Sequence, residues 1–249
     1  MSDLTGLIER AWGTLSRWAV PVMMTLAYAF LAATAETDTT GKLWMAGGLG
    51  LVLIAWFSFR ALAESAALSR ALAVGDTARL RELSGRELAR RSRPAARARF
   101  LVARAFAQLL RGEHPAALAT LDEARPAPDL EPLATALRIT ALVELDRRAA
   151  LAGLAVRCPR TPWLAWLTDA QLAWRRDDLD AAAPLLARVT GDIRAGSALR
   201  AIAHVYAARI AEARGDAADA SRHRAAAANL AAPDAAWLRG GATASAARP

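Results

Sequence analysis

Apolar and polar positions divide the chain into an apolar beginning and an amphipathic remainder. Two runs without charge lie near the start: Trp18–Ala35 (WAVPVMMTLAYAFLAATA) and Leu43–Phe59 (LWMAGGLGLVLIAWFSF). An α-helix rises about 1.5 Å per residue, so the first run spans about 27 Å, close to the thickness of a bilayer core. Neither run keeps the polar stripe of a soluble surface helix. The pattern predicts a transmembrane hairpin of two helices over residues 18–63.

Charged residues beside the two runs predict the orientation of this hairpin. The connector Glu36–Lys42 (ETDTTGK) carries two acidic residues and one lysine, whereas residues 60–99 hold ten arginines and four acidic residues. Basic segments that flank a span stay in the cytoplasm. We therefore expect a two-pass protein of a bacterial-type inner membrane, with the N-terminus and everything after the second span in the cytoplasm.

A cleavable signal peptide is an alternative interpretation of the first run. Ala33-Thr34-Ala35 has the small-x-small form of a cleavage site. The segment before it is long for a leader and contains Asp3 and Glu9, and a second apolar run begins only eight residues later. Even after cleavage, that second run would stop transfer and leave the rest of the chain inside.

The remainder of the chain is rich in Ala, Leu and Arg, with apolar positions at helical spacing. No segment alternates with period two, so helices alone are expected. Five turn signals separate paired helical stretches, and they are centred on Gly75, Gly112, Asp146, Asp177 and Gly215. Their spacings of 37, 34, 31 and 38 average 35, which is typical of helix-turn-helix repeats. The predicted fold class is all-α: the hairpin, then an α-solenoid of four to five units.

The second helix of these units resembles that of the tetratricopeptide repeat (TPR) family. The family places small, bulky and small residues five, nine and twelve positions after the turn. The residues that carry the resemblance, from the first unit to the last, are Leu80 and Ser84; Ala117, Leu121 and Ala124; Ala150 and Leu154, after a shift; Ala182, Leu186 and Val189; and Ala220 and Ala227. Trp166 and Ala170 stand where the first helix favours an aromatic and a small residue, whereas Arg224 departs from the pattern. The resemblance covers about residues 62–231 and implies stacked helix pairs with a concave binding surface.

A two-span anchor followed by such repeats is similar to HemY-like membrane TPR proteins and to cytochrome c assembly factors that hold an apoprotein. The resemblance implies a scaffold or adaptor that mediates protein–protein interaction at the cytoplasmic face of the inner membrane. The alternative is a structural subunit of a larger membrane complex, with contacts made mainly by the hairpin. An enzyme would need convergent carboxylates or a nucleophile with its base, and the sequence offers neither pattern.

These patterns divide the chain into four parts. We expect a cytoplasmic N-terminal segment at 1–17, the hairpin at 18–63, and the repeat domain at 64–239. The tail 240–249 (GGATASAARP) consists mostly of small residues, has no apolar anchor and is expected to be disordered. Membrane lipid contacts the chain through residues 18–63 in this interpretation, and the other partner is a protein.

Three tryptophans are candidates for partner binding. Trp163, Trp166 and Trp174 fall on one helical face together with Ala170. They could form an aromatic floor that grips a partner peptide. The competing interpretation is packing between neighbouring units, which we favour because large aromatic side chains dominate core energetics.

Arginines make up nearly all of the basic residues, and the formal net charge of the chain is +8. The densest basic segment, RRSRPAARAR, includes Arg90, Arg91 and Arg93 as candidates for contact with anionic lipid. Nucleic acid is not an expected partner, because Pro94 breaks the helix and no aromatic residue is interleaved to stack on bases. A solvated face is the ordinary role of such a run.

The sequence gives no support for a metal, a cofactor or a disulfide. Cys158 is the only cysteine, and the three histidines, His114, His204 and His223, lack partners at ligand spacing. The glycines of Gly47–Gly50 fall inside the second apolar run, so they are not read as a phosphate-binding loop. Neither catalytic nor cofactor-binding residues are predicted.

Overall fold

The computed structural model describes residues 50, 53, 56, 63–89, 94–126, 128–156 and 161–240. The chain divides into two units, Met1–Ala63 and Glu64–Pro249. All but four positions of the predicted hairpin lie outside the described residues, as do Arg90, Arg91 and Arg93, Cys158 and residues 241–249. None of the described helices combines the length and the apolar composition needed to cross a membrane.

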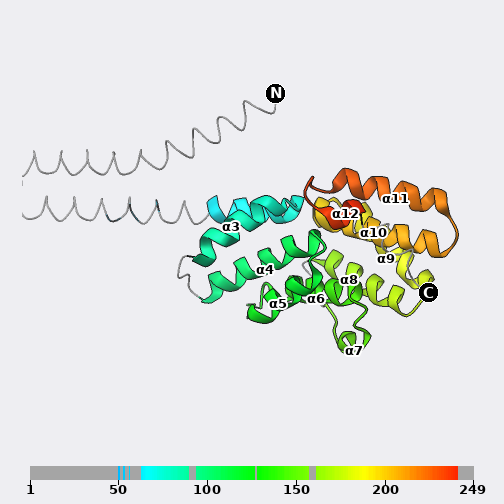
Figure 1. Cartoon of the computed structure of the whole chain (residues 1–249), viewed down its shortest axis with the longest axis horizontal. Helices are drawn as coiled ribbons and strands as arrows, with labels where there is room; N and C mark the ends of the chain where they lie inside the picture. Colours follow the sequence, from blue (N-terminus) through cyan, green and yellow to red (C-terminus); the bar gives the residue numbers. More distant parts are fainter. Residues whose placement is uncertain are drawn as a thin grey trace, which may run out of the picture. The chain divides into compact units, whose positions relative to one another are not determined.

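All regular structure in the described part of the second unit is helical, which confirms the predicted all-α class (Figure 1). It begins with a helical segment at 64–74, which we call the entry helix. The elements that follow are α3 (Thr77–Ala89), α4 (Pro94–Leu110), α5 (His114–Glu123), α6 (Glu131–Glu144), α7 (Arg148–Leu151), α8 (Pro162–Arg175), α9 (Leu179–Gly191), the 3₁₀ turn η1 (Ile193–Ala195), α10 (Gly196–Ala213), α11 (Ala217–Leu230) and α12 (Ala236–Gly240).

Helices that follow one another along the chain pack together as pairs. α4 packs with α5, α8 with α9 and α10 with α11, and α9 also contacts α10 of the next pair. The first helices of the pairs supply most of the largest buried side chains, among them Phe106 on α4, Leu137 on α6 and Ile202 on α10. Sequential pairs around a shared core are consistent with a helical repeat.

Each of the five predicted turns contains a residue with left-handed backbone. The φ angles are 75° at Gly75, 83° at Gly112, 55° at Asp146, 60° at Asp177 and 78° at Gly215. Glycine adopts this region without strain, and aspartate is one of the few other residues found there. At Gly75 a side chain is also excluded by space, because a Cβ atom would lie 2.9 Å from the Cβ of Ala198. The turns predicted from sequence spacing are confirmed.

Replacing Asp177 by glycine is expected to stabilise the protein. The residue holds a left-handed φ of 60°, a conformation that costs most residues with a Cβ about 1–2 kcal/mol, aspartate less than that, and glycine nothing. The expected rise in the melting temperature is about 2–4 °C, measured by circular dichroism on the purified full chain. Asp177→Val is the control and is expected to lower it, since a β-branched residue is a worse fit to this region. Equal melting temperatures for the two variants would contradict the prediction.

The small residues of the predicted second helices lie at helix contacts. Ala117, Ala182, Ala220 and Ala227 are all fully buried. A larger side chain at such a position would push the two helices of a pair apart. The pattern that produced the family resemblance therefore corresponds to real close packing in the second, fourth and last units.

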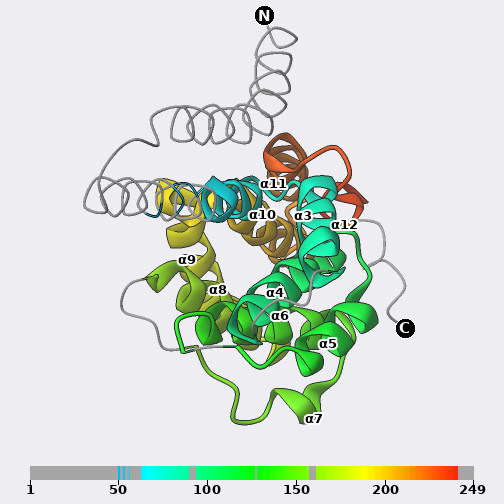
Figure 2. The ribbon, with the colours of Figure 1, turned by 90° about the vertical axis from the view of Figure 1, so that its left-hand side faces the viewer.

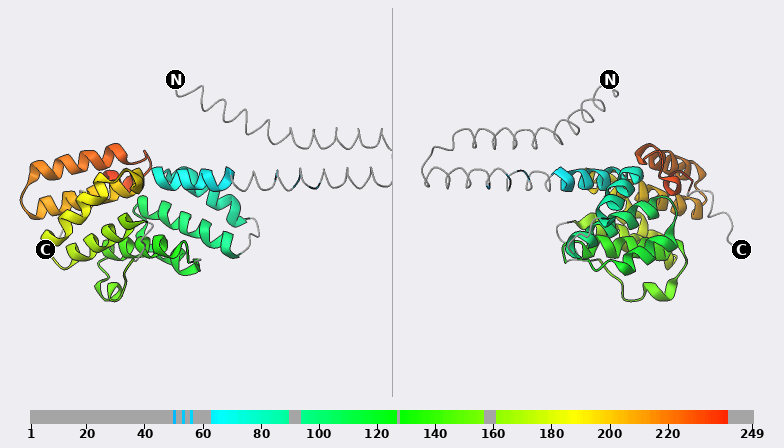
Figure 3. Two further views of the ribbon diagram at one scale, coloured as in Figure 1. Left: turned by 180° about the vertical axis from the view of Figure 1, so that it is seen from behind. Right: turned by 60° about the vertical axis from the view of Figure 1, so that its left-hand side comes forward.

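The third unit departs from the expected pattern. Its second helix, α7, has only four residues and ends at Leu151, while Ala150 is exposed and Leu154 lies beyond the helix. The short helix ends because Ala152 turns to extended backbone and Gly153 takes a φ of 80°. α6 instead packs directly on α8, and α7 projects from the other helices (Figure 3). The alignment of Ala150 and Leu154 with the repeat positions is wrong.

The first and last pairs of the array meet. Ser197 at the start of α10 donates a hydrogen bond from Oγ to the carbonyl oxygen of Ala73 at 3.2 Å. A Cβ atom on Gly196 would come within 3.0 Å of the same oxygen, so the two backbones are close. Thr77 on α3 is hydrogen-bonded to Asp234, just before α12, and Figure 2 shows α3 and α12 side by side. The array closes on itself, whereas the repeat pattern suggested an open concave face.

Candidate functional site

The first helices of the successive pairs surround an apolar pocket of about 680 Å³. Side chains from the entry helix and from α4, α6, α8 and α10 line it, chief among them Leu72, Phe106, Leu133, Trp163, Leu164 and Leu199. Its few polar lining residues include Ser69, Asp129 and Thr161. We refer to this space as the apolar pocket.

The three candidate tryptophans lie in three different surroundings. Trp163 is partly buried and lines the apolar pocket, and Trp166 is partly buried against the edge of the core. Trp174, at 8% exposed, is buried in the interior, where its ring meets the ring of Tyr206 edge-on at 5.5 Å. Eleven residues separate Trp163 from Trp174, which is about 16 Å along a helix. The structure does not bring all three together as one aromatic floor.

Each of the two partly buried tryptophans has an arginine of a neighbouring element over its ring. The guanidinium carbon of Arg194 lies 5.6 Å from the ring centre of Trp163, and that of Arg188 lies 5.9 Å from the ring centre of Trp166. Both distances fall within the range of cation–π contacts. Ile193 stands beside Arg194 in η1 and is 81% exposed. These five residues on α8, α9 and η1 form what we call the Trp–Arg surface.

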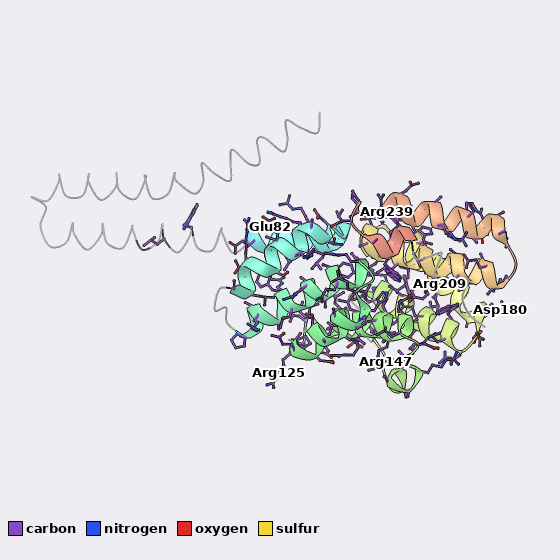
Figure 4. All side chains as sticks on the ribbon, in the orientation of Figure 1. Glu82, Arg125, Arg147, Asp180, Arg209 and Arg239 are labelled. Carbon is purple, nitrogen blue, oxygen red and sulfur yellow. The ribbon has the colours of Figure 1, made fainter. Side chains whose placement is uncertain are left out.

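An ion pair is buried where α6 and α10 meet. The side chains of Glu144 and Arg209 are only 9% and 8% exposed, and their two contacts measure 2.5 and 3.0 Å. Tyr206 donates its hydroxyl to Glu144 at 2.7 Å, and the indole N–H of Trp237 on α12 donates to the same carboxylate at 3.3 Å. Figure 4 shows Arg209 among the packed helices, while Arg125 and Arg147 lie at the edge. The cluster joins three elements far apart in sequence.

The protonation states of the groups in this cluster do not change near neutral pH. Burial by itself would raise the pKa of the Glu144 carboxyl, but the hydrogen bonds and charge of Arg209 outweigh it and hold the pKa below its ordinary value. Burial raises the pKa of Tyr206 well above its ordinary value, and the negative charge of Glu144 acts in the same direction. Glu144 therefore stays ionised and Tyr206 stays protonated at neutral pH. The cluster's contribution is to packing and not to acid–base chemistry.

The polar cluster has a weak signal in the sequence. Arg209 interrupts the run Ala207–Ala211 (AARIA), in which its neighbours are apolar, and Glu144 closes the apolar stretch of α6. A charge within an apolar helical stripe indicates a buried partner. Nothing local says which residue that partner is, because Glu144 and Arg209 are 65 positions apart.

His204 and His223 face each other between α10 and α11. Their Nδ1 atoms are 2.9 Å apart, and the Nε2 atom of His223 lies 3.5 Å from a carboxylate oxygen of Asp219. Burial, followed by the nearby His223 and Arg200, lowers the pKa of His204 to about 4. His204 is therefore neutral at physiological pH.

The free energy of unfolding is expected to fall as the pH drops from 7 to 5, in part because of His204. The unfolded chain protonates this residue near pH 6.5 and the folded chain only near 4, so acid favours the unfolded state between these values. After allowance for partial exposure, His204→Gln is expected to remove about 1 kcal/mol of that fall. Urea unfolding at pH 7 and pH 5 measures the difference. An unchanged pH dependence in the variant would contradict the assignment.

Within the described ranges, no group of three or more His, Cys, Asp or Glu residues is placed to hold a metal ion. His114 is partly buried and packs edge-on against Trp237, with ring centres 5.5 Å apart. Burial lowers the pKa of His114, so this histidine is a neutral packing residue.

Comparison of the chain with known families, curated proteins and solved structures identifies no similar protein. No protein-family model, no curated protein and no solved structure matches the chain. The function is therefore argued from the geometry above.

Proposed function

We propose that the protein is a membrane-anchored scaffold of TPR type, whose Trp–Arg surface binds a partner protein at the cytoplasmic face of the inner membrane. Sequential helix pairs with left-handed turns near every thirty-fifth residue support the repeat assignment. The two uncharged runs within residues 18–63 support the anchor.

The observation that carries the proposal is an isoleucine left 81% exposed beside two arginine-covered tryptophans. Tryptophan and arginine are the residues that contribute most often to binding hot spots. An exposed large apolar side chain such as Ile193 gains free energy when a partner covers it. Arg188 favours a partner segment with acidic residues around an apolar centre, whereas Arg194 is paired with Asp192 at 2.7 Å.

Two surface variants test this proposal. Ile193→Asp and Arg188→Glu each put a negative charge on the Trp–Arg surface, where it would repel the acidic partner. The full chain is purified from its native membranes in mild detergent, and the proteins that accompany it are quantified. Recovery of the principal partner is expected to fall at least tenfold for each variant, with the helical content unchanged.

Arg147→Glu is the matched control, because it reverses an exposed charge beside α7, away from the Trp–Arg surface. Recovery with this variant is expected to equal that of the wild type. Equal recovery with all three variants would overturn the proposal.

A separate exchange tests whether the anchor itself makes the main contacts. Residues 1–63 are replaced by an unrelated two-span anchor, and recovery of the same partner is measured. The scaffold proposal predicts that the partner is retained. Loss of the partner would favour the alternative, a structural subunit that contacts its complex through the hairpin. Release of the wild-type chain from membranes by alkaline carbonate would contradict the anchor.

A further inference from the structure

We propose that the apolar pocket binds a single aliphatic chain, supplied by a membrane lipid or by a free fatty acid. The pocket's chemistry is independent of the proposed scaffold function. Only the supply of the chain from the bilayer rests on the proposed anchor.

Closure of the helical array decides what kind of ligand can enter. In an open array, the first helices of the pairs would present a continuous concave face to a partner. Here the entry helix, itself a first helix, lies against the start of α10, held by the hydrogen bond between Ser197 and Ala73 and by the close backbone approach at Gly196. A partner helix needs about 10–12 Å of width, and a helix of the protein itself already occupies this side. A single hydrocarbon chain needs far less width.

The pocket's size and lining fit such a chain. Ligand pockets typically enclose about 300–1,000 Å³ and are mostly apolar with a few polar groups, and this one measures about 680 Å³. A water molecule takes up about 30 Å³ in the liquid, and with a methylene group counted as the same size an 18-carbon chain fills about 540 Å³ of the pocket. Leucine, phenylalanine and tryptophan side chains dominate the wall. A wall of this composition favours an apolar ligand.

One part of the pocket could hold the polar end of the ligand. Ser69, Asp129 and Thr161 contribute to the lining, and the Thr161 hydroxyl is buried without a hydrogen-bond partner among the described residues. An ester or carboxyl oxygen would satisfy that hydroxyl. The Asp129 carboxylate repels a free carboxylate, so it favours an ester-linked chain over an ionised fatty acid.

The position of the pocket in the sequence indicates a source for the chain. Ser69 follows Phe59, the last residue of the second apolar run, by ten residues. Ten residues reach at most about 35 Å. In the proposed anchored protein, bilayer lipid is thus the nearest abundant source of aliphatic chains.

Photolabelling of the full chain tests the proposal in two arms. In the first, the protein is placed in phosphatidylcholine nanodiscs that contain a lipid with a diazirine on its acyl chain. In the second, a diazirine derivative of palmitic acid is added to the protein in unlabelled nanodiscs. After irradiation and digestion, labels are located by mass spectrometry. We expect labels on α6 and α8 at Leu133, Trp163 or Leu164, in the first arm or in both.

Pocket-filling variants make the test specific. Ala73→Trp and Leu133→Trp each place a large side chain in the apolar pocket and are expected to lower labelling of α8 at least tenfold. The matched control is Ala187→Trp, which fills a separate cavity of about 390 Å³ lined by α9, α10 and α11 and is expected to leave that labelling unchanged. Circular dichroism verifies that each variant is folded. If one of the two pocket-filling variants does not fold, the other alone provides the test.

The outcomes show whether the pocket binds an aliphatic chain and whether that chain comes from a bilayer lipid or a free fatty acid. They do so independently of the scaffold proposal. Labelling of α6 and α8 by palmitic acid alone supports the pocket and assigns a free fatty acid as its ligand. Labelling by the lipid arm assigns bilayer lipid. Labels absent from α6 and α8 in both arms, or unchanged by both pocket-filling variants, overturn the proposal. A photoreactive residue at Leu133 that cross-links to a second protein instead would make a protein the occupant and overturn it as well. None of these results depends on partner recovery through Ile193.

Discussion

Replacing Glu144 by leucine is expected to lower the free energy of unfolding by about 3–5 kcal/mol. The substitution leaves the Arg209 guanidinium buried without its countercharge, since it loses contacts of 2.5 and 3.0 Å to the carboxylate. It also removes the acceptor of the Tyr206 hydroxyl and of the Trp237 indole N–H. Buried donors without acceptors add to the cost. Urea unfolding of the purified full chain at constant detergent concentration, followed by circular dichroism, measures the change.

Two further variants isolate the buried charge as the cause. Adding Arg209→Met to Glu144→Leu removes the buried guanidinium as well and is expected to recover a large part of the lost stability. Glu123→Leu breaks the exposed pair with Arg97, both partners being about half exposed, and is expected to cost less than about 1 kcal/mol. If Glu144→Leu cost no more than Glu123→Leu, the ion pair would not stabilise the meeting of α6 and α10.

Replacing Trp174 by alanine is expected to cost about 3–5 kcal/mol, the range for large aromatic side chains in a core. The indole is 8% exposed, meets Tyr206 edge-on, and lies 5.3 and 5.5 Å from the guanidinium carbons of Arg175 and Arg209. Its loss leaves a cavity beside the buried ion pair and removes two cation–π contacts. The same urea unfolding experiment measures the effect.

Trp166→Ala is the matched control on the same helix. Trp166 is partly buried and only one arginine, Arg188, lies over its ring, so the expected cost is about 1–2 kcal/mol. Partner recovery, by contrast, is expected to fall with Trp166→Ala and to follow only the folded fraction with Trp174→Ala. Equal losses of stability for the two variants would contradict the different surroundings that the structure gives them.

Closure of the array makes its ends interdependent. In an open repeat array, each unit contacts only its neighbours, and stability is close to a sum of local terms. Here Thr77 is bonded to Asp234, and Trp237 reaches Glu144 on α6. Substitutions near residue 234 or 237 are therefore expected to destabilise the first helices as well. The geometry of the apolar pocket depends on residues from both ends of the array.

Candidate recognition residues could be predicted only in part. The sequence places Trp163 and Trp166 on one face of α8, three residues apart, and the structure keeps them near each other with an arginine over each ring. The sequence does not distinguish Trp174 from these two residues, because helical spacing shows which face a residue lies on but not what packs against that face. Ile193 could not be selected either, since exposure is a property of the folded molecule.

The helical class and the five turns can be predicted from residue types and their spacing, because a left-handed φ at Gly75, Asp146 or Asp177 depends on the local residue type. The small positions at which paired helices touch can be predicted in the same way, because they are set by spacing along each helix. The pairing of Glu144 with Arg209 and the closure of the entry helix on α10 depend instead on how the helices pack in three dimensions. Those contacts join residues 65 and 124 positions apart, and their energies depend on shape and burial that no local pattern encodes.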